Sequence, residues 1–323
     1  MSGQVKTIVR VLRSAGSVTL GNGNLVLLGV ENGRLIEKIY DGDDLKDQRK
    51  VADNVKDGSS AVYAVSEKNV FGLYISQDNH IRASEFDADS EEWDDADLSG
   101  LGDVTVHPDS HLAIAAVYES SLIFFQAADG VIKSINHDQE SNNWTEAFPV
   151  PGGAAAGGTP ISAFSTNKAV VVSFIGQDNK LHAHSRDFET GEWTDSALPS
   201  ASWEGSVTSL VVSQDVDTGA YEAFALVGTT VDHVKKDGTR DALGSIQSGE
   251  FVPATKAEAG DVYGNNYGII QNYWNQGGGG CGRGGGNYIC GGCGRVGGNC
   301  VCGSGTYVCV LPPIVNPCRP CWY

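Results

Sequence analysis

Three tryptophans recur at the same place in a repeated pattern, each six residues after an aspartate. They are Trp93, Trp144 and Trp193, which follow Asp87, Asp138 and Asp187. An indole ring can stack on the apolar C–H face of a sugar, and it can also fill the space between two packed sheets. One tryptophan per repeat at a fixed position favours the second role, because every repeat has to pack against the next.

The tryptophans belong to a repeat of about fifty residues. A nine-residue block occurs at 33–41, 79–87, 130–138, 179–187 and, more weakly, 229–237, each time with an aliphatic third residue. Every copy ends on an aspartate, at Asp41, Asp87, Asp138, Asp187 and Asp237, with spacings of 46, 51, 49 and 50 residues. We expect these aspartates to accept backbone N–H bonds in the turn after each strand.

An apolar run rich in β-forming residues precedes each block, as in VFGLYIS (70–76) and VVVSFIG (170–176). Gly, Asn or Asp separates the run from the block in the clearest copies, which predicts a β-hairpin. Repeats of this length with three or four short strands are typical of propeller blades, in which neighbouring sheets bury one another. We therefore predict an all-β fold, a β-propeller at 1–260 with five blades favoured over six.

The ends of the propeller are less regular. The segment VKTIVRVL (5–12) alternates well enough to be a strand, and we expect it to help close the ring. Residues 261–280 are expected to form a linker or a degenerate blade, which would be the sixth. A small Gly/Cys-rich tail follows at 281–323.

Two stretches, SLIFFQAADGVIKSINHDQESNNW (121–144) and LYISQDNHIRASEFDADSEEW (73–93), resemble the repeat of the fungal fucose-specific lectins in strand order, turn and terminal tryptophan. The resemblance covers three repeats fairly and five loosely. It implies a six-bladed propeller in which a first-strand arginine and the glutamate of an I-R-E motif hold the sugar hydroxyls, with aromatic rings against the apolar side of the sugar.

This chain departs from that pattern at the sugar-holding positions. The first-strand positions hold Gly72, Leu122 and Val172, and the glutamate position holds Glu37, Ala83, Ser134, Ala183 and His233. Only the first repeat keeps the carboxylate. A polyol site cannot lose both charged partners and keep its chemistry, so we expect the fucose mode to be lost in most or all repeats.

Candidate ligand-binding residues follow from the register of the repeat. One position changes type between repeats, with Arg82, Lys133 and His182 in the middle three copies. It could face a groove, but we favour a plain solvated face. The candidate set is Glu37, Arg82, Trp93, Lys133, Trp144, His182 and Trp193. The sequence contains no G-x-S-x-G, H-E-x-x-H or P-loop motif, and we predict neither catalytic residues nor a cofactor.

The composition excludes several classes of partner. The net charge is −18, from 40 acidic and 22 basic side chains, and no basic patch interrupts this acidity. Nucleic acid and anionic membranes are therefore disfavoured as partners. The resemblance to the fungal lectins implies a glycan or glycoprotein as a partner. No apolar run approaches the roughly 18–20 residues that span a bilayer, so no membrane insertion is expected. The N-terminal segment lacks the apolar stretch of a secretory signal.

All eight cysteines lie in the tail, at Cys281, Cys290, Cys293, Cys300, Cys302, Cys309, Cys318 and Cys321. We favour disulfides of unknown pairing, because a glycine-rich segment of this size has almost no apolar core of its own. The alternative is a zinc site, because two C-x-x-C pairs have a loose zinc-ribbon spacing. Its ligands would be Cys290, Cys293, Cys318 and Cys321. Free or intermolecular thiols are a third reading.

The sequence thus predicts a lectin-like carbohydrate-binding or interaction propeller without catalytic activity. Its tail would cross-link the chain or mediate assembly into a homo-oligomer. The alternative is a structural protein that assembles into fibres or coats through the tail, because contacts that do not close produce filaments. The cysteine-rich tail favours an extracellular or cell-surface location reached by unconventional export, with the cytoplasm as the alternative.

Overall fold

The computed structural model describes residues 3–20, 23–65, 69–98, 100–117, 120–151, 155–215 and 218–254, and two short strands further on. The chain divides into two compact units, 1–278 and 279–323. Within the second unit, β22 (Gly294–Val296) and β23 (Asn299–Val301) form an antiparallel pair. The cysteine side chains lie outside the described residues, and so do the predicted disulfides and the alternative zinc site.

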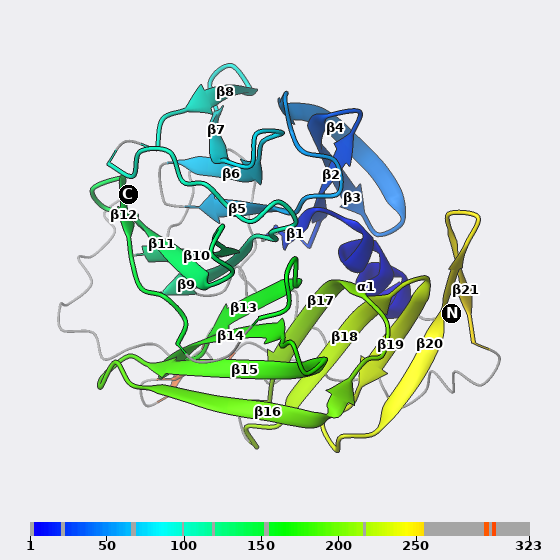
Figure 1. Cartoon of the computed structure of the whole chain (residues 1–323). Helices are drawn as coiled ribbons and strands as arrows, with labels where there is room; N and C mark the ends of the chain where they lie inside the picture. Colours follow the sequence, from blue (N-terminus) through cyan, green and yellow to red (C-terminus); the bar gives the residue numbers. More distant parts are fainter. Residues whose placement is uncertain are drawn as a thin grey trace. The chain divides into compact units, whose positions relative to one another are not determined.

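Five antiparallel sheets follow one another along the first unit and surround a central axis (Figure 1). The first sheet contains β1 (Gly16–Thr19), β2 (Leu25–Glu31), β3 (Arg34–Asp41) and β4 (Asp44–Ala52). The second contains β5 (Ala61–Val65), β6 (Val70–Ile75), β7 (Ile81–Asp87) and β8 (Glu92–Ala96). The third contains β9 (Ala113–Val117), β10 (Ser120–Gln126), β11 (Ile132–Asp138) and β12 (Asn143–Glu146).

The fourth sheet contains β13 (Ile161–Ser165), β14 (Ala169–Ile175), β15 (Lys180–Asp187) and β16 (Trp193–Ser202). The fifth contains β17 (Val207–Gln214), β18 (Tyr221–Val227), β19 (Thr230–Val234), β20 (Arg240–Gln247) and β21 (Glu250–Pro253). Strands pair in chain order within every sheet, and the first strands of successive sheets contact one another. The predicted all-β propeller with five blades is therefore confirmed.

The predicted hairpins form where a residue with positive φ occupies the turn between the second and third strands. In the first, second and fourth sheets this residue is Asn32 (φ 54°), Asn79 (φ 61°) and Asn179 (φ 59°). In the third sheet it is Gly130 (φ 85°). Asparagine and glycine tolerate this left-handed conformation better than other residues, which explains why the polar gap in the sequence becomes a tight turn.

Four of the five recurring aspartates, Asp87, Asp138, Asp187 and Asp237, accept a backbone N–H in the next turn, as predicted, whereas Asp41 contacts Lys46 at 3.7 Å. The Oδ1 atom of Asp87 accepts the N–H of Asp89 at 2.8 Å, and that of Asp138 accepts the N–H of Ser141 at 2.7 Å. Asp187 accepts from Thr190 at 2.8 Å in the same way. These backbone bonds are the main reason why the pKa of each of the three carboxyl groups lies below its usual value of 3.8.

We expect acid to destabilise the fold through these turns. Folding lowers the three pKa values, so the stabilisation is complete above the usual value and is lost as the pH falls below about 4 through the folded values. A Tm profile between pH 6 and 2.5 should fall more steeply for the wild type than for the triple variant Asp87→Asn, Asp138→Asn, Asp187→Asn, which keeps an acceptor oxygen at each turn. Asp94→Asn, an exposed site on β8, is the control and should leave the profile unchanged. Identical profiles for the wild type and the triple variant would show that these three turns do not cause the loss of stability in acid.

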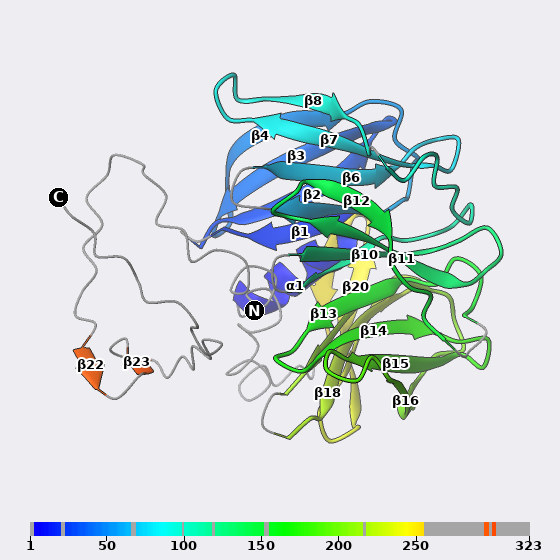
Figure 2. The same ribbon diagram turned by 90° about the vertical axis from the view of Figure 1, so that its left-hand side faces the viewer.

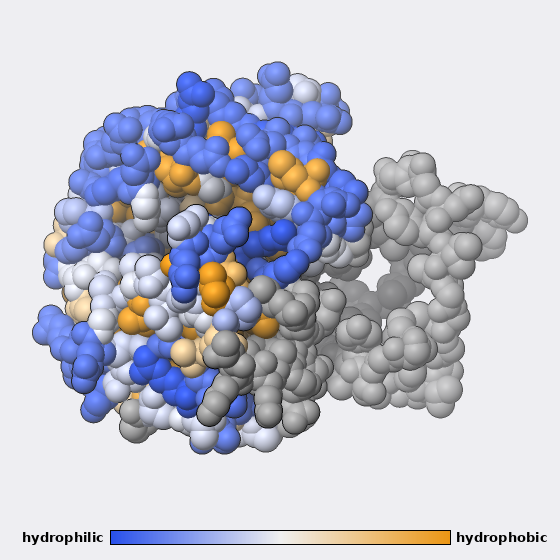
Figure 3. All heavy atoms as spheres, turned by 90° about the vertical axis from the view of Figure 1, so that its right-hand side faces the viewer, coloured by the Kyte–Doolittle hydropathy of each residue, from blue (hydrophilic) through white to orange (hydrophobic). Residues whose placement is uncertain are grey.

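The core lies between successive sheets. Phe71 and Ile81 of the second sheet pack with Ile123 and Ile135 of the third, and all four side chains are at most 2% exposed. Similar clusters join the third sheet to the fourth and the fourth to the fifth. On the face drawn in Figure 3, hydrophilic side chains predominate and hydrophobic ones are exposed in small, separate groups.

The segment that we expected to be a closing strand is a helix, and that prediction was wrong. Helix α1 (Gly3–Arg13) buries Val5, Ile8, Val9 and Leu12, which lie one turn apart along one face. This i, i+3, i+4, i+7 spacing fits a helical face better than it fits alternation along a strand. Among the described residues no helix has the length and the apolarity to cross a membrane.

Helix α1 lies between the fifth sheet and the first and contacts both (Figures 1 and 2). Its apolar face packs on Phe224, Val231 and Leu243 of the fifth sheet. On another side, Lys6 and Arg10 contact Asp43 in the turn between β3 and β4, with N–O distances of 2.9 and 3.0 Å. The ring is thus closed by five sheets and one helix.

Candidate functional site

Two predicted ligand-binding residues, Glu37 and Trp93, lie where the first and second sheets pack against each other, a junction that we call the groove between them. Glu37 lies on β3 and is 8% exposed, and its Oε2 accepts a hydrogen bond of 2.7 Å from the hydroxyl of Tyr63 on β5. Trp93, at the start of β8, has its ring centroid 6.2 Å from that of Tyr63. Tyr63 therefore links the carboxylate of one sheet to the indole of the next.

An arginine and a second aromatic ring complete this groove. Arg49 on β4 is paired in register with Glu37, and its guanidinium lies 5.5 Å from the ring centroid of Phe86 on β7. Phe86 in turn contacts Trp93, with ring centroids 5.3 Å apart. The Arg49 side chain is 30% exposed, and its Nε donates to Oδ2 of Asp47 at 2.7 Å. We call this set, Glu37, Arg49, Tyr63, Phe86 and Trp93, the first groove.

The electrostatics of the first groove follow from burial. Burial raises the pKa of Glu37, and the hydrogen bond from Tyr63 and the charge of Arg49 lower it in part. Burial also raises the pKa of Tyr63 well above its usual value, and the neighbouring carboxyl group of Glu37 adds to this. Tyr63 therefore stays protonated and donates to Glu37. The arrangement contains a carboxylate that accepts from Tyr63, a guanidinium that donates to Asp47, and three aromatic rings, of which Phe86 and Trp93 are partly exposed.

Gly72 explains how Trp93 fits between the two sheets. A Cβ atom on Gly72 would lie 3.0 Å from Cγ1 of Val51 in the first sheet and 3.5 Å from the indole of Trp93. The glycine thus leaves room for the indole against the first sheet. The Nε1 atom of Trp93 is buried and has no hydrogen-bond partner in the described structure.

Trp144 has a different environment in the groove between the second and third sheets. It is 2% exposed, stacks on His137 with centroids 4.2 Å apart, and meets the edge of Phe71 at 5.5 Å. The indole is thus packed between the second and third sheets. This packing supports the structural role that the sequence favoured for the recurring tryptophan.

Trp193, between the third and fourth sheets, is intermediate between these two cases. Its ring lies 5.7 Å from that of Phe148, and the guanidinium of Arg186 lies 4.4 Å from the same Phe148 ring. This groove has a cation and two partly exposed aromatic rings, but Ala183 occupies the glutamate position. It is therefore a reduced version of the first groove.

The three side chains at the variable position of the repeat lie on separate sheets and are not brought together. Each contacts an acidic neighbour. Arg82 pairs with Asp103 at 2.9 Å, Lys133 with Asp129 at 3.0 Å, and His182 contacts Asp178 at 3.1 Å. Arg82 and Lys133 are exposed ion pairs, which contribute little to stability.

A buried polar cluster between the fourth and fifth sheets was not anticipated from the sequence. The Nε1 atom of Trp203 donates to Oδ2 of Asp232 at 3.0 Å, and Arg240 pairs with the same carboxylate. Trp203 and Asp232 are 2% and 5% exposed. The cluster joins two sheets in the way that a structural wedge does, and its indole and carboxylate are already bonded to each other.

A cavity of about 510 Å³ lies where the first strands of the five sheets converge. Small residues and serines line much of it, and some of their hydroxyls bond neighbouring sheets. The hydroxyl of Ser60 accepts from the N–H of Leu112, and that of Ser162 accepts from the N–H of Val212 at 3.0 Å. These bonds hold neighbouring sheets together at the wall of the cavity.

The comparisons with known proteins agree with this architecture. No family model matches the chain, and no curated protein matches it. Among solved structures, AofleA from Arthrobotrys oligospora is 17% identical, with 73% of each chain covered and a TM-score of 0.57. A mutant of the Aleuria aurantia lectin in complex with Fucα1-6GlcNAc is 17% identical, with 73% of this chain and 80% of that chain covered and a TM-score of 0.55.

The SapL1 lectin in complex with alpha methyl fucoside is 18% identical, with 76% of this chain and 84% of that chain covered and a TM-score of 0.54. The Aleuria aurantia lectin is described as a six-bladed β-propeller. These likenesses confirm the expected resemblance at the level of the fold. The described part of this chain has the fold of the fungal lectin propellers, with five sheets and helix α1 in its ring.

Proposed function

We propose that the protein is a non-enzymatic, carbohydrate-binding propeller whose site is the first groove. One observation carries this proposal. Of the three grooves that hold a recurring tryptophan, this one keeps the glutamate of the repeat and adds an arginine and two partly exposed aromatic rings to it. The likeness in fold to lectins solved with fucosides supports a sugar as the ligand class.

The chemistry of the first groove suits a sugar. Trp93 and Phe86 offer aromatic surface for the apolar C–H side of a pyranose ring. Glu37 accepts from hydroxyl groups and Arg49 donates to them, so the two can hold a pair of neighbouring hydroxyls. Arg49 comes from β4 and not from the strand that carries the arginine in the fucose lectins. We therefore expect a different orientation of the sugar, and a preference other than fucose is compatible with the site.

Glu37→Gln provides the first test. The amide oxygen can still accept from Tyr63, whereas the charge that would strengthen a bond to a sugar hydroxyl is lost. Charge-assisted hydrogen bonds are worth about 1.5–3 kcal/mol, so we expect the affinity for the best glycan on an array to fall at least about tenfold. Isothermal titration of the same glycan gives the value, and the thermal stability should not decrease.

Glu92→Gln is the matched control, because Glu92 is an exposed carboxylate at the start of β8 and its loss changes the net charge equally. It should bind like the wild type. Equal affinity of Glu37→Gln and the wild type would remove the first groove as the site. A wild type that binds no glycan on the array would refute the proposal as a whole.

Assembly through the cysteine-rich tail is a separate proposal that rests on the sequence alone. Native mass spectrometry of the full chain with and without reductant tests it. Oligomers that dissociate when the reductant is added are expected, and a monomer under both conditions would contradict it.

A further inference from the structure

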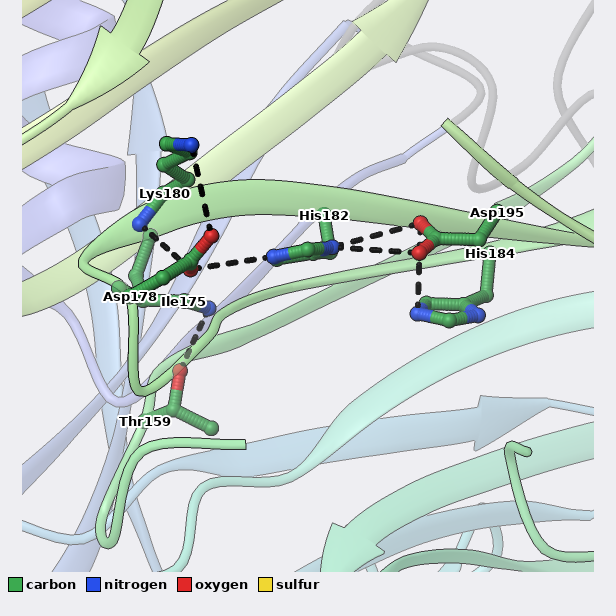
Figure 4. A network of polar contacts seen from close by, with 7 residues as sticks. All are labelled: Thr159, Ile175, Asp178, Lys180, His182, His184 and Asp195. Carbon is green, nitrogen blue, oxygen red and sulfur yellow. Dashed lines mark hydrogen bonds and ion pairs between the residues drawn. The ribbon is translucent and has the colours of Figure 1, made fainter. Parts of the chain in front are cut away.

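Two histidines and an aspartate gather on the outer strands of the fourth sheet, away from the first groove (Figure 4). His182 and His184 are two residues apart on β15, and alternation along a strand places them on the same face. Asp195 on β16 is the register partner of His184, so it lies beside both imidazoles.

The distances from each histidine to Asp195 match those between ligands of a single ion. Nδ1 of His182 lies 3.4 Å from both carboxylate oxygens of Asp195, and Nε2 of His184 lies 3.6 Å from Oδ1. One ligand atom from each residue fits within 4.8 Å of the others. Tetrahedral ligands at about 2.0–2.2 Å from zinc are separated by roughly 3.3–3.6 Å.

The buried nitrogen of His184 is an independent sign of a ligand. The His184 side chain is 3% exposed, and its Nε2 has no hydrogen-bond partner in the described structure although it faces Asp195. A buried polar atom without a partner costs about 1–3 kcal/mol and needs an explanation. A bound cation between Nε2 and the carboxylate would provide one.

Asp178 and Gly176 fix the orientation of the His182 imidazole toward Asp195. Its Nε2 lies 3.1 Å from Oδ1 of Asp178, so a proton on Nε2 leaves Nδ1 as the free lone pair that faces Asp195. Gly176 makes room for this contact, because a Cβ there would lie 2.7 Å from the Asp178 oxygen and 2.9 Å from Nε2 of His182.

An aromatic ring supports both imidazoles. The ring of Phe174 stacks on His184 with centroids 5.1 Å apart at 6°, and on His182 with centroids 6.1 Å apart at 19°. Phe174 is itself 2% exposed. The two imidazole planes, 24° apart, are thus held by packing before any ligand binds, which lowers the entropic cost of binding.

We propose that His182, His184 and Asp195 bind a divalent transition-metal ion of the zinc type. Two imidazoles and one carboxylate suit zinc and its neighbours, whereas calcium and magnesium prefer sites made of oxygen ligands. Asp195 is 45% exposed, so the ion has a path from solvent. Three protein ligands leave a fourth position for water or for an oxygen donor of a bound molecule.

The test is a titration of the full chain with Zn²⁺ in competition with a chromophoric chelator, and with Co²⁺ as a spectroscopic probe. Asp195→Asn is the main variant, because the residue is partly exposed and the change keeps its shape. We expect the variant to lose one equivalent of Zn²⁺ and the metal-dependent rise in Tm. His184→Gln should do the same, and Asp178→Asn should weaken binding about 10- to 100-fold.

The Co²⁺ spectrum separates this site from the cysteines of the tail. A site of two imidazoles and one carboxylate gives visible absorption bands without the thiolate charge-transfer band, and these bands should vanish in Asp195→Asn. His107→Gln is the matched control, since it removes a histidine from a loop outside the cluster and should leave both readouts unchanged. If Asp195→Asn binds as many equivalents as the wild type, or if its metal-dependent Tm shift is the same, the proposal is wrong.

Discussion

Trp144→Ala is expected to lower the free energy of unfolding by about 3–5 kcal/mol, the range for removing a large aromatic side chain from a core. The indole is 2% exposed and is held between two rings, the stacked imidazole of His137 and the edge of Phe71. Because Phe71 belongs to the second sheet and Trp144 to the third, the cavity would open at the contact between two blades. Aromatic pairs of this geometry add about 0.5–1.5 kcal/mol beyond their buried area.

Urea denaturation followed by circular dichroism measures this change. Trp193→Ala is the matched control, because the same residue at the same repeat position is only partly buried, and it should lose clearly less stability. Sugar binding at the first groove should survive in Trp144→Ala at temperatures where the variant is folded. A loss below about 1 kcal/mol would show that Trp144 is not a packing wedge.

Leu12→Ala is expected to cost about 2–5 kcal/mol, and its effect should extend to the closure of the ring. Leu12 is 2% exposed and belongs to the helix face that covers Phe224 and Leu243 of the fifth sheet. Removing its side chain would weaken the contact that holds the helix to that sheet. The ion pairs of Lys6 and Arg10 with Asp43 are exposed, and such pairs contribute too little to compensate.

Hydrogen exchange by mass spectrometry, together with urea denaturation, tests this prediction. In Leu12→Ala the amides of β18 and β20 should lose protection before those of the second and third sheets. Arg13→Ala, at an exposed position one residue further on, should change stability by no more than about 0.5 kcal/mol. Uniform loss of protection over all five sheets would argue against a local role of the helix in closure.

The architecture could be predicted because each repeat carries its own local signals. The polar turns with Asn79 or Gly130 and the capping aspartates are set by residues within one hairpin. Helix α1 could not be assigned with the same rule. The apolar spacing in 5–12 fits one face of a helix, and the partial alternation of apolar and polar residues in the same segment also fits a strand. The choice depends on the fifth sheet, which lies more than two hundred residues away and buries that face.

Only part of the candidate site could be predicted from the sequence. Glu37 could be identified because it is the carboxylate that survives at one position of the repeat. Arg49 and Tyr63 lie outside the aligned block, and they reach Glu37 through pairing with β4 and through packing of the second sheet on the first. Likewise, Trp93 and Trp144 have the same place in the repeat, and two residues of β6, Gly72 beside Trp93 and Phe71 beside Trp144, decide how each indole is held.

Helix α1 also has a consequence for the timing of folding during synthesis. Its partners Phe224, Val231 and Leu243 follow it by more than two hundred residues along the chain. At the roughly 5–20 residues per second of translation, this separation corresponds to about ten to fifty seconds. During that interval the apolar face of the helix has been synthesised, but the fifth sheet that buries it has not. We therefore expect this apolar face to be accessible to chaperones and to neighbouring chains until the fifth sheet has left the ribosome.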